Sequence, residues 1–310
     1  MGNLKNTTAM NGLFAAEYFD LESQAVGETF RIFVAKPMVM EPDNKYPAIY
    51  ILDGNGMFAS VMEMQRLMSM GNEIPPAFVV GVGYAVEDGF TATMDKRYRD
   101  YTPTVGGEVE AASKVKFDST YDIQPGGGAA FLKFLREELK GVLESAYPLD
   151  PDDTAIGGAS LGGLFLSWVL LTRPEAFHRY IICSPSIWWH KEAVWQWEED
   201  YAAERKDLNA TVFVTAGGLE TVDIVKPQFE AMVQVNGPMK EVLEKSIAAY
   251  EKHGWPRMAE ITPVLVDKLR SRNYPGLKIH CHNLPDETHL SVVPGAMSRG
   301  LRYVFGHWDP

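Results

Sequence analysis

Short apolar runs alternate with segments of helical periodicity along most of this 310-residue chain. The strand-like runs cover residues 30–35, 46–52, 78–82, 154–156, 180–183, 211–215 and 277–284. Apolar side chains at helical spacing cover residues 57–70, 131–146, 161–171 and 294–305. Strands that alternate with helices favour a mostly parallel sheet with helices on both faces. The pattern therefore predicts a fold of the α/β class.

Two long segments interrupt this alternation. Residues 85–128 are polar, contain glycine and proline, and are predicted to be irregular. Residues 221–273 contain helix-like stretches at 240–253 and 263–271. Long excursions from a compact domain are usually functional or mobile. We therefore expect one domain over residues 1–310, with a helical cap at about 221–273 above a binding pocket. The alternative is a decoration packed away from that pocket, since long insertions cost little free energy.

Composition and charge narrow the class of partner. A hydrophobic content of 46% and an aromatic content of 11% are typical of a globular protein with a sizeable core. The net charge of −12 disfavours nucleic acid and anionic membrane surfaces as partners. No apolar stretch approaches the length of a membrane span, and the first residues lack the apolar segment of a secretory signal. We expect a cytoplasmic protein that acts on a small molecule; its oligomeric state is open.

The most specific motif is Gly158-Ala159-Ser160-Leu161-Gly162, between a strand-like run and an apolar helix. A strand, tight turn and helix place the serine at a strained corner with its hydroxyl exposed above the sheet edge. Glycines allow the close approach of strand and helix, and the helix N-terminus offers free N–H groups. The motif predicts Ser160 as a nucleophile, against the alternative of a glycine-rich turn with an incidental serine.

A serine hydroxyl needs a base within hydrogen-bond reach, and the base needs an acid to orient it. In enzymes with this serine turn, the acid and then the histidine follow on loops after later strands. His289 lies just past the last strand-like run, where the base is expected. Glu220 ends the glycine turn after residues 211–215, and Asp223 is the alternative acid. We favour Glu220.

The tetrahedral intermediate of ester cleavage needs two preorganised N–H donors. The backbone of Leu161, directly after the serine, is predicted to supply one donor. The loop after residues 46–52 is predicted to supply the other, from Gly54 or Asn55. His280 and His282 share one side of the last strand-like run, but no third metal ligand accompanies them. We predict neither a metal nor a cofactor.

Several side chains are candidates for contact with a substrate. The apolar candidates, each of which core packing would explain equally well, are Met57, Phe58, Tyr84, Trp188 and Trp189. Arg97 and Arg99 offer planar forks that could hold a carboxylate or a catecholate. Salt bridges from these arginines to Asp95 or Asp100 are the alternative, which we favour slightly. The methionine stripe at positions 62, 64, 68 and 70 is interpreted as core filling.

Several stretches together resemble one family of α/β-hydrolases. They are Tyr50-Ile51-Leu52-Asp53-Gly54, Val80-Gly81-Val82-Gly83-Tyr84, Arg99-Asp100-Tyr101-Thr102-Pro103, the segment 131–139, the serine motif itself and Ser184-Pro185-Ser186-Ile187-Trp188-Trp189. In this order they resemble the "putative esterase" family, which includes enterochelin and salmochelin trilactone esterases, esterase D and mycolyltransferases. The last stretch is similar to the ferric-siderophore esterase branch in particular.

The resemblance implies an α/β-hydrolase fold and a serine carboxylesterase that forms an acyl-enzyme. It implies Ser160 as nucleophile, His289 as base and Glu220 as acid, with Asn55 and Leu161 as oxyanion donors. Siderophore trilactones and aryl or acyl esters are the implied substrates, although the negative charge does not favour a bulky ferric catecholate. An acyltransferase that uses the same residues, or a binding protein without catalysis, are the alternatives.

Overall fold

A nine-stranded sheet forms the centre of the computed structural model, which describes residues 7–85, 89–106, 124–235, 244, 247–248, 251–252, 254 and 257–306. The strands are β1 (Thr8–Ala9), β2 (Ala16–Ser23), β3 (Glu28–Ala35), β4 (Tyr46–Ile51), β5 (Phe78–Tyr84), β6 (Leu149–Ala159), β7 (Arg179–Cys183), β8 (Ala210–Thr215) and β9 (Leu277–Cys281). Their order is β1-β2-β3-β5-β4-β6-β7-β8-β9. Pairs from β1 to β5 are antiparallel, and all pairs from β5 through β4 to β9 are parallel.

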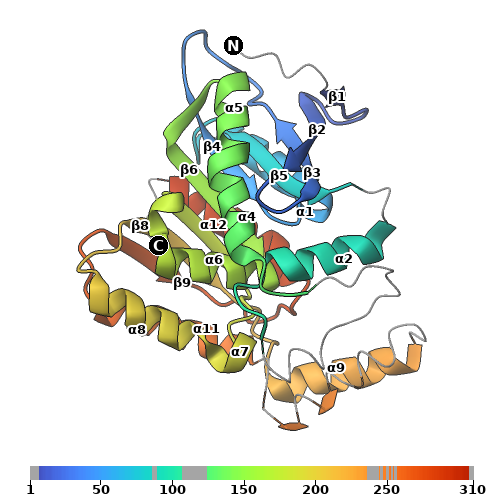
Figure 1. Ribbon diagram of the computed structural model, residues 1–310, viewed down its shortest axis with the longest axis vertical. Helices are drawn as coiled ribbons and strands as arrows, with labels where there is room; N and C mark the ends of the chain where they lie inside the picture. The colour runs from blue at the N-terminus through green and yellow to red at the C-terminus, as the bar shows by residue number, and fades with distance from the viewer. Residues whose placement is uncertain are drawn as a thin grey trace.

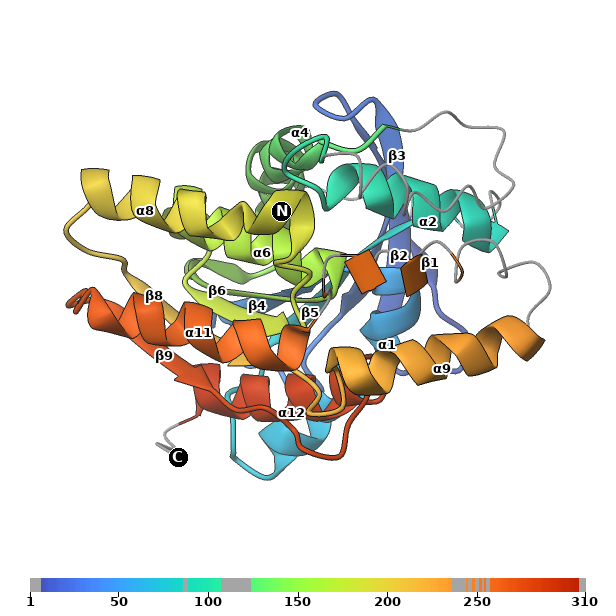
Figure 2. The ribbon, with the colours of Figure 1, turned by 90° about the horizontal axis from the view of Figure 1, so that it is seen from below.

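Helices cover both faces of this sheet (Figures 1 and 2). The helical elements are α1 (Gly54–Met70), α2 (Gly89–Asp100), α4 (Gly128–Lys133), the π-helix η2 (Phe134–Leu139), α5 (Lys140–Ala146), α6 (Leu161–Thr172), the 3-10 helix η3 (Pro174–Ala176), α7 (Trp189–Glu192), α8 (Val194–Glu204), α9 (Val222–Val235), α11 (Met258–Ser271) and α12 (Val292–Phe305). The run from α4 to α5, together with α6, α8 and α11, packs on one face. Helices α1 and α12 pack on the other.

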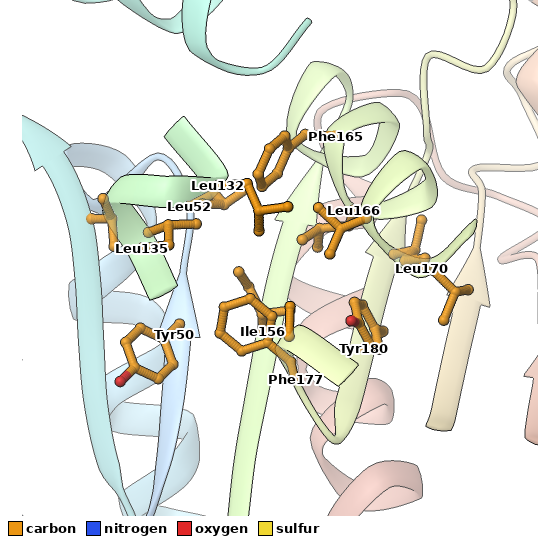
Figure 3. Packing of buried hydrophobic residues seen from close by; sticks show 14 of the residues in the cluster. Tyr50, Leu52, Leu132, Leu135, Ile156, Phe165, Leu166, Leu170, Phe177 and Tyr180 are labelled. Atoms are coloured by element: carbon orange, nitrogen blue, oxygen red, sulfur yellow. The ribbon is translucent and has the colours of Figure 1, made fainter. Parts of the chain in front are cut away.

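The core is built from alternate residues of the central strands, as the period of two in a β-strand requires. On one face, Tyr50, Ile156 and Tyr180 belong to an apolar cluster that also includes residues of α6 (Figure 3). Their neighbours Ile49 and Ile181 belong to the apolar cluster on the opposite face, with α1 and α12. All six residues of β4 are buried, which explains its near-continuous apolar sequence. The predicted fold class is confirmed by this two-sided core.

Helix α2 lies within the segment that the sequence predicted to be irregular, so that prediction was wrong for residues 89–100. The helix has no apolar stripe because its buried side chains include charged ones. Asp95, Lys96 and Asp100 are all at most 7% exposed. The Lys96 ammonium pairs with Glu28 at 3.2 Å. Hydrophobic periodicity cannot reveal a helix whose buried face is held by ion pairs.

The predicted cap over residues 221–273 also needs a correction at its C-terminal end. Helix α11 places Ile261, Leu265 and Leu269 in the core and contacts β8 and β9. It is therefore a layer of the main domain rather than part of a cap. Most of the helix predicted at 240–253 lies outside the described residues.

Candidate active site

Ser160 occupies the turn between β6 and α6, with backbone angles φ 59° and ψ −118°. A positive φ is uncommon for a residue other than glycine and marks a strained corner. Its N–H donates to the carbonyl of Cys183 on the neighbouring strand at 3.0 Å. A Cβ on Gly163 would lie 2.9 Å from both the Cys183 oxygen and the Pro185 Cα. The glycine is thus required for helix α6 to begin this close to the next strand.

A buried carboxylate and a histidine meet near the same edge of the sheet. Glu220, which is 1% exposed, lies with Oε2 2.7 Å from Nδ1 of His289. Its other oxygen, Oε1, accepts hydrogen bonds from the Ser184 hydroxyl at 2.5 Å and the Gly217 N–H at 2.7 Å. The alternative acid, Asp223, lies exposed in the first turn of α9. Glu220 is therefore the carboxylate that contacts the histidine.

Backbone contacts between two loops bring this pair together. The N–H groups of Gly218 and Leu219 donate to the carbonyls of Leu284 and Glu287, at 2.7 and 3.0 Å. A Cβ on Gly217 would lie 2.4 Å from the Glu287 oxygen. A side chain at position 217 would therefore push apart the loop that carries Glu220, called here the acid loop, and the loop that carries His289, the histidine loop. The adjacent glycines were the signal in the sequence for this close approach.

The Ser160 hydroxyl lies 3.5 Å from the hydroxyl of Ser186, and this is its one hydrogen bond within the described part of the chain. It makes none to His289 there. Catalytic hydrogen bonds are often long or poorly aligned in enzymes without substrate and tighten only in the complex. The parallel strands β6 to β9 nevertheless direct the serine, acid and histidine loops to one edge of the sheet (Figure 1).

Leu161 and Asn55 both lie in the first turn of a helix, where N–H groups have no acceptor within the helix. The Asn55 side chain holds its turn against β5. Its Oδ1 accepts from the Tyr84 N–H at 2.8 Å, and its Nδ2 donates to the Tyr84 carbonyl at 2.9 Å. Gly54 is buried against the same strand, where a Cβ would lie 2.7 Å from the Gly81 carbonyl carbon. The absence of a side chain at Gly54 therefore allows the turn before α1 to pack directly against the backbone of β5.

Arg97 connects the turn before α1 to the serine turn. Its guanidinium binds both oxygens of Asp53, at 2.7 and 3.1 Å, and donates to the Ala159 carbonyl at 3.2 Å. Burial alone lowers the pKa of Arg97, but the adjacent Asp53 carboxylate more than offsets this and raises it. The Arg97–Asp53 ion pair therefore lies against the serine turn, at the Ala159 carbonyl. Sequence reasoning missed this pair, because the two residues are 44 positions apart and no local pattern links them.

Arg99 makes the salt bridge that the sequence offered as the alternative to a ligand contact. Its Nε and Nη2 donate to the two oxygens of Asp100 at 2.7 and 3.0 Å, and its Nη1 lies 3.6 Å from Glu28. Asp100 is fully buried and also accepts from the Tyr84 hydroxyl at 2.9 Å. The fork of Arg99 is thus already engaged within the protein.

The two adjacent tryptophans have different environments. Trp189 is 1% exposed, and its indole N–H donates to the Thr104 hydroxyl at 3.0 Å. Its ring meets that of Tyr98 edge-on, with centroids 5.5 Å apart. Trp188 is only partly buried. Of the other apolar candidates, Phe58 and Tyr84 are each 2% exposed and belong to the core. Trp188 is therefore the tryptophan whose surface a ligand could reach.

The described residues contain no group of three or more His, Cys, Asp or Glu side chains that could hold a metal ion. The ring centroids of His280 and His282 lie 6.2 Å apart, and His280 also stacks on Phe213.

Burial raises the pKa of the Cys183 thiol to about 12, so that this group beside the serine turn stays protonated at neutral pH. Across the helices that the structure describes, none is both long and apolar enough to cross a bilayer.

Comparison with known families agrees with this geometry. Residues 23–270 match the family described as "Putative esterase", and the chain belongs to this family. It is accordingly a carboxylic ester hydrolase with the α/β-hydrolase fold, as the sequence predicted.

Named relatives and solved structures point to one branch of the family. The chain is 30% identical to the ferri-bacillibactin esterase BesA of Bacillus subtilis, over 91% of this chain and 87% of the relative. It is 26% identical to the siderophore triacetylfusarinine C esterase of Aspergillus fumigatus, over 94% of each chain. The crystal structure of BES protein from Bacillus cereus is similar with a TM-score of 0.71 and 29% identity, over 96% of this chain and 98% of that one. The structure of siderophore hydrolase EstB from Aspergillus nidulans is similar with a TM-score of 0.72 and 25% identity, over 98% of this chain and 99% of that one.

Proposed function

We propose that this protein is a siderophore esterase that cleaves ester bonds through an acyl-enzyme on Ser160. The observation that carries the proposal is the 2.7 Å contact between Glu220 and His289 beside the strained serine turn. That contact supplies the oriented base that a serine nucleophile requires. The similarity to named siderophore esterases over nearly the whole chain supports the substrate class.

In the proposed reaction, Ser160 Oγ attacks the ester carbonyl carbon and its proton passes to Nε2 of His289. The Nδ1–H of His289 remains donated to Glu220, which fixes the ring and stabilises the imidazolium that forms. Negative charge develops on the former carbonyl oxygen. The backbone N–H groups of Leu161 and Asn55 stabilise it.

Collapse of the intermediate breaks the bond to the alcohol oxygen, which takes the proton from His289. A water molecule then attacks the carbonyl carbon of the acyl-enzyme in the same way. His289 accepts a proton from the water and returns it to Ser160 as the acid product leaves. Activity therefore requires the imidazole to be neutral at the start of each step. We therefore expect the rate to fall in acid, because a protonated imidazole cannot act as the base.

The excursion after Glu220 is proposed to shape the substrate pocket. It leaves the domain at residue 221, directly after the acid, and returns where the Ala259 N–H contacts the Glu220 carbonyl at 3.4 Å. Both of its ends are thus anchored at the acid loop. Replacing residues 236–256 with a short glycine-serine linker should change the preference among esters of different size while cleavage of a small acetate ester persists. Unaltered preference in a folded variant would place specificity elsewhere.

A substrate panel tests the proposed function. Wild type and Ser160→Ala are compared on short-chain p-nitrophenyl esters, feruloyl esters and siderophore trilactones with and without iron, and products are identified by mass. We expect trilactone opening by wild type and a loss of about a thousandfold or more in Ser160→Ala, with unchanged unfolding temperature. A labelled fluorophosphonate should attach to Ser160 alone.

Three results would argue against the proposal. Near-normal turnover by Ser160→Ala would remove the nucleophile. Cleavage of simple aryl esters with no activity on trilactones would remove the substrate class. Transfer of the acyl group to an added alcohol in preference to water would assign the protein to the acyltransferases instead.

A further inference from the structure

The turn that follows β7 reaches the buried acid through a side chain that the reaction scheme does not use. Ser184 is fully buried and has a backbone φ of 41°, in the left-handed region. Its N–H donates to the Thr215 carbonyl at 2.7 Å, which fixes the turn on β8. Its hydroxyl donates to Oε1 of Glu220 at 2.5 Å. A strained backbone angle at a buried polar residue is an observation that calls for a functional explanation.

We infer that Ser184 is a positioning residue of the esterase reaction, which holds the Glu220 carboxylate in the orientation that serves His289. This inference rests on the proposed function, since it assigns a role to the partner of the proposed acid. Ser184 touches neither the reacting atoms nor the histidine in the described contacts, and it acts through Glu220.

The distribution of hydrogen bonds on Glu220 supports this role. Oε1 receives two donors, the Ser184 hydroxyl and the Gly217 N–H, while Oε2 faces Nδ1 of His289. Donors to an ionised carboxylate stabilise its charged form, which burial would otherwise disfavour. They also fix the rotation of the carboxylate plane, because only one orientation satisfies both donors. Without Ser184, one buried donor remains and that orientation is less well defined.

The same turn also contacts the nucleophile. The Ser186 N–H donates to the Ser160 carbonyl at 3.0 Å, and the two hydroxyl groups lie 3.5 Å apart. The Ser160 N–H in turn donates to Cys183. Residues 183–186 therefore lie between the serine turn and the acid loop and hydrogen-bond to both. A change in this turn displaces the acid relative to the serine, so the position of Ser184 matters for the pair.

The test compares Ser184→Ala with wild type in rate, pH dependence and stability. Alanine keeps a Cβ, so the variant removes the hydroxyl at an almost unchanged backbone cost. We expect kcat to fall about 5- to 20-fold with KM changed less than twofold. The acid limb of kcat/KM should also change, because Ser184 acts through the Glu220–His289 pair that takes part in proton transfer.

Ser167→Ala is the matched control. Ser167 is 1% exposed, and its hydroxyl donates to the Gly163 carbonyl within α6, without contact to Glu220. This variant reports the effect of removing a buried hydroxyl near the site, and its pH profile should match that of wild type. If Ser184→Ala does not fold, Ser184→Gly takes its place, since glycine adopts a positive φ without strain.

A double-variant cycle with Glu220→Gln separates the possible outcomes. The inference predicts that Ser184→Ala shifts the pH profile in the wild-type background and has no further effect beside Glu220→Gln. If Glu220→Gln is strongly impaired but Ser184→Ala behaves like Ser167→Ala, the positioning role is wrong and the proposed function stands. If Glu220→Gln keeps normal activity, the proposed acid is wrong and the role of Ser184 fails with it. If neither Ser184 variant folds, Ser184 is structural and the inference is overturned.

Discussion

Two neighbouring turns, before α1 and before α6, solve the same geometric problem by different means. Each carries a residue other than glycine at positive φ, Asp53 at 55° and Ser160 at 59°, within two residues of the end of a parallel strand. The Ser160 turn is held by backbone hydrogen bonds to residues 183 and 186 and by close glycine packing. The Asp53 turn depends in addition on Arg97 and Tyr101, side chains at the end of α2 and just after it.

The two turns differ in whether the residues that hold them are close to the turn in sequence. Close packing of a turn leaves glycines in the local sequence, and these are visible as a motif. The side chains of Arg97 and Tyr101, which also hold the Asp53 turn, lie far along the chain and leave no motif beside it. The Asp53 turn should consequently be sensitive to substitutions within α2 and just after it. Three substitutions test that contrast.

Arg97→Met should have the largest effect of the three. The variant removes the contacts to both Asp53 and the Ala159 carbonyl, and it leaves the Asp53 carboxylate without this cation. Displacement of a positioning group by about 1 Å can lower a rate by about a hundredfold. We expect kcat/KM to fall about 10- to 100-fold in steady-state assays of a folded variant. Arg302→Met, which alters a half-exposed pair with Glu73, is the control and should keep the wild-type rate. A rate in Arg97→Met equal to that control would mean that the Asp53 turn holds itself.

Gly163→Ala should act on the serine turn through packing. The new Cβ would lie 2.9 Å from backbone atoms of Cys183 and Pro185, which cannot move aside as a flexible side chain could. We expect the free energy of unfolding to fall by about 1–3 kcal/mol in urea titration. In Gly141→Ala, no atom lies within 4 Å of the new Cβ on α5, and the same measurement should find no loss or a gain of up to about 1 kcal/mol. Equal stability of the two variants would contradict the packing explanation.

Tyr101→Phe should have the smallest effect. The Tyr101 hydroxyl accepts the Asp53 N–H at 2.9 Å, and the ring lies under the Arg97 guanidinium at 5.3 Å. Phenylalanine keeps the ring and removes only the acceptor, which leaves one backbone donor without its partner. We expect a loss of about 1 kcal/mol in unfolding free energy and a two- to fivefold fall in kcat/KM. A fall as large as that of Arg97→Met would show that the hydroxyl, and not the ion pair, holds the turn.

The sequence predicted the elements that are built on apolar periodicity. The central strands and helices α1, α6 and α12 appear within a few residues of their expected bounds. The polar helix α2 was missed because its buried face carries charges. The strand β2 was also missed, since only Ala16, Phe19 and Ser23 of its eight residues are buried. Periodicity therefore predicts an element only where apolar burial on one face determines it.

The candidate site divides along the same line. The positions of Ser160 and Glu220 follow from glycine-bearing turns after strands, which are local signals. The contact between Glu220 and His289 follows from the order of parallel strands, so topology was sufficient to expect it. The partner of Arg97 could not be predicted, because Asp95 and Asp100 are much closer to it in sequence than Asp53 is. Long-range polar pairs depend on exact side-chain positions, which spacing along the chain does not determine.

The backbone pairing between residues 217–219 and 284–287 has a consequence for the engineering of this enzyme. Grafting a longer histidine loop from another protein would break the hydrogen bonds that Gly218 and Leu219 donate, and the acid would lose its partner even though no catalytic residue had changed. Recombination of this protein with its relatives should therefore succeed only when both loops come from the same parent. The two segments are more than 60 residues apart in the chain, but they must be exchanged together.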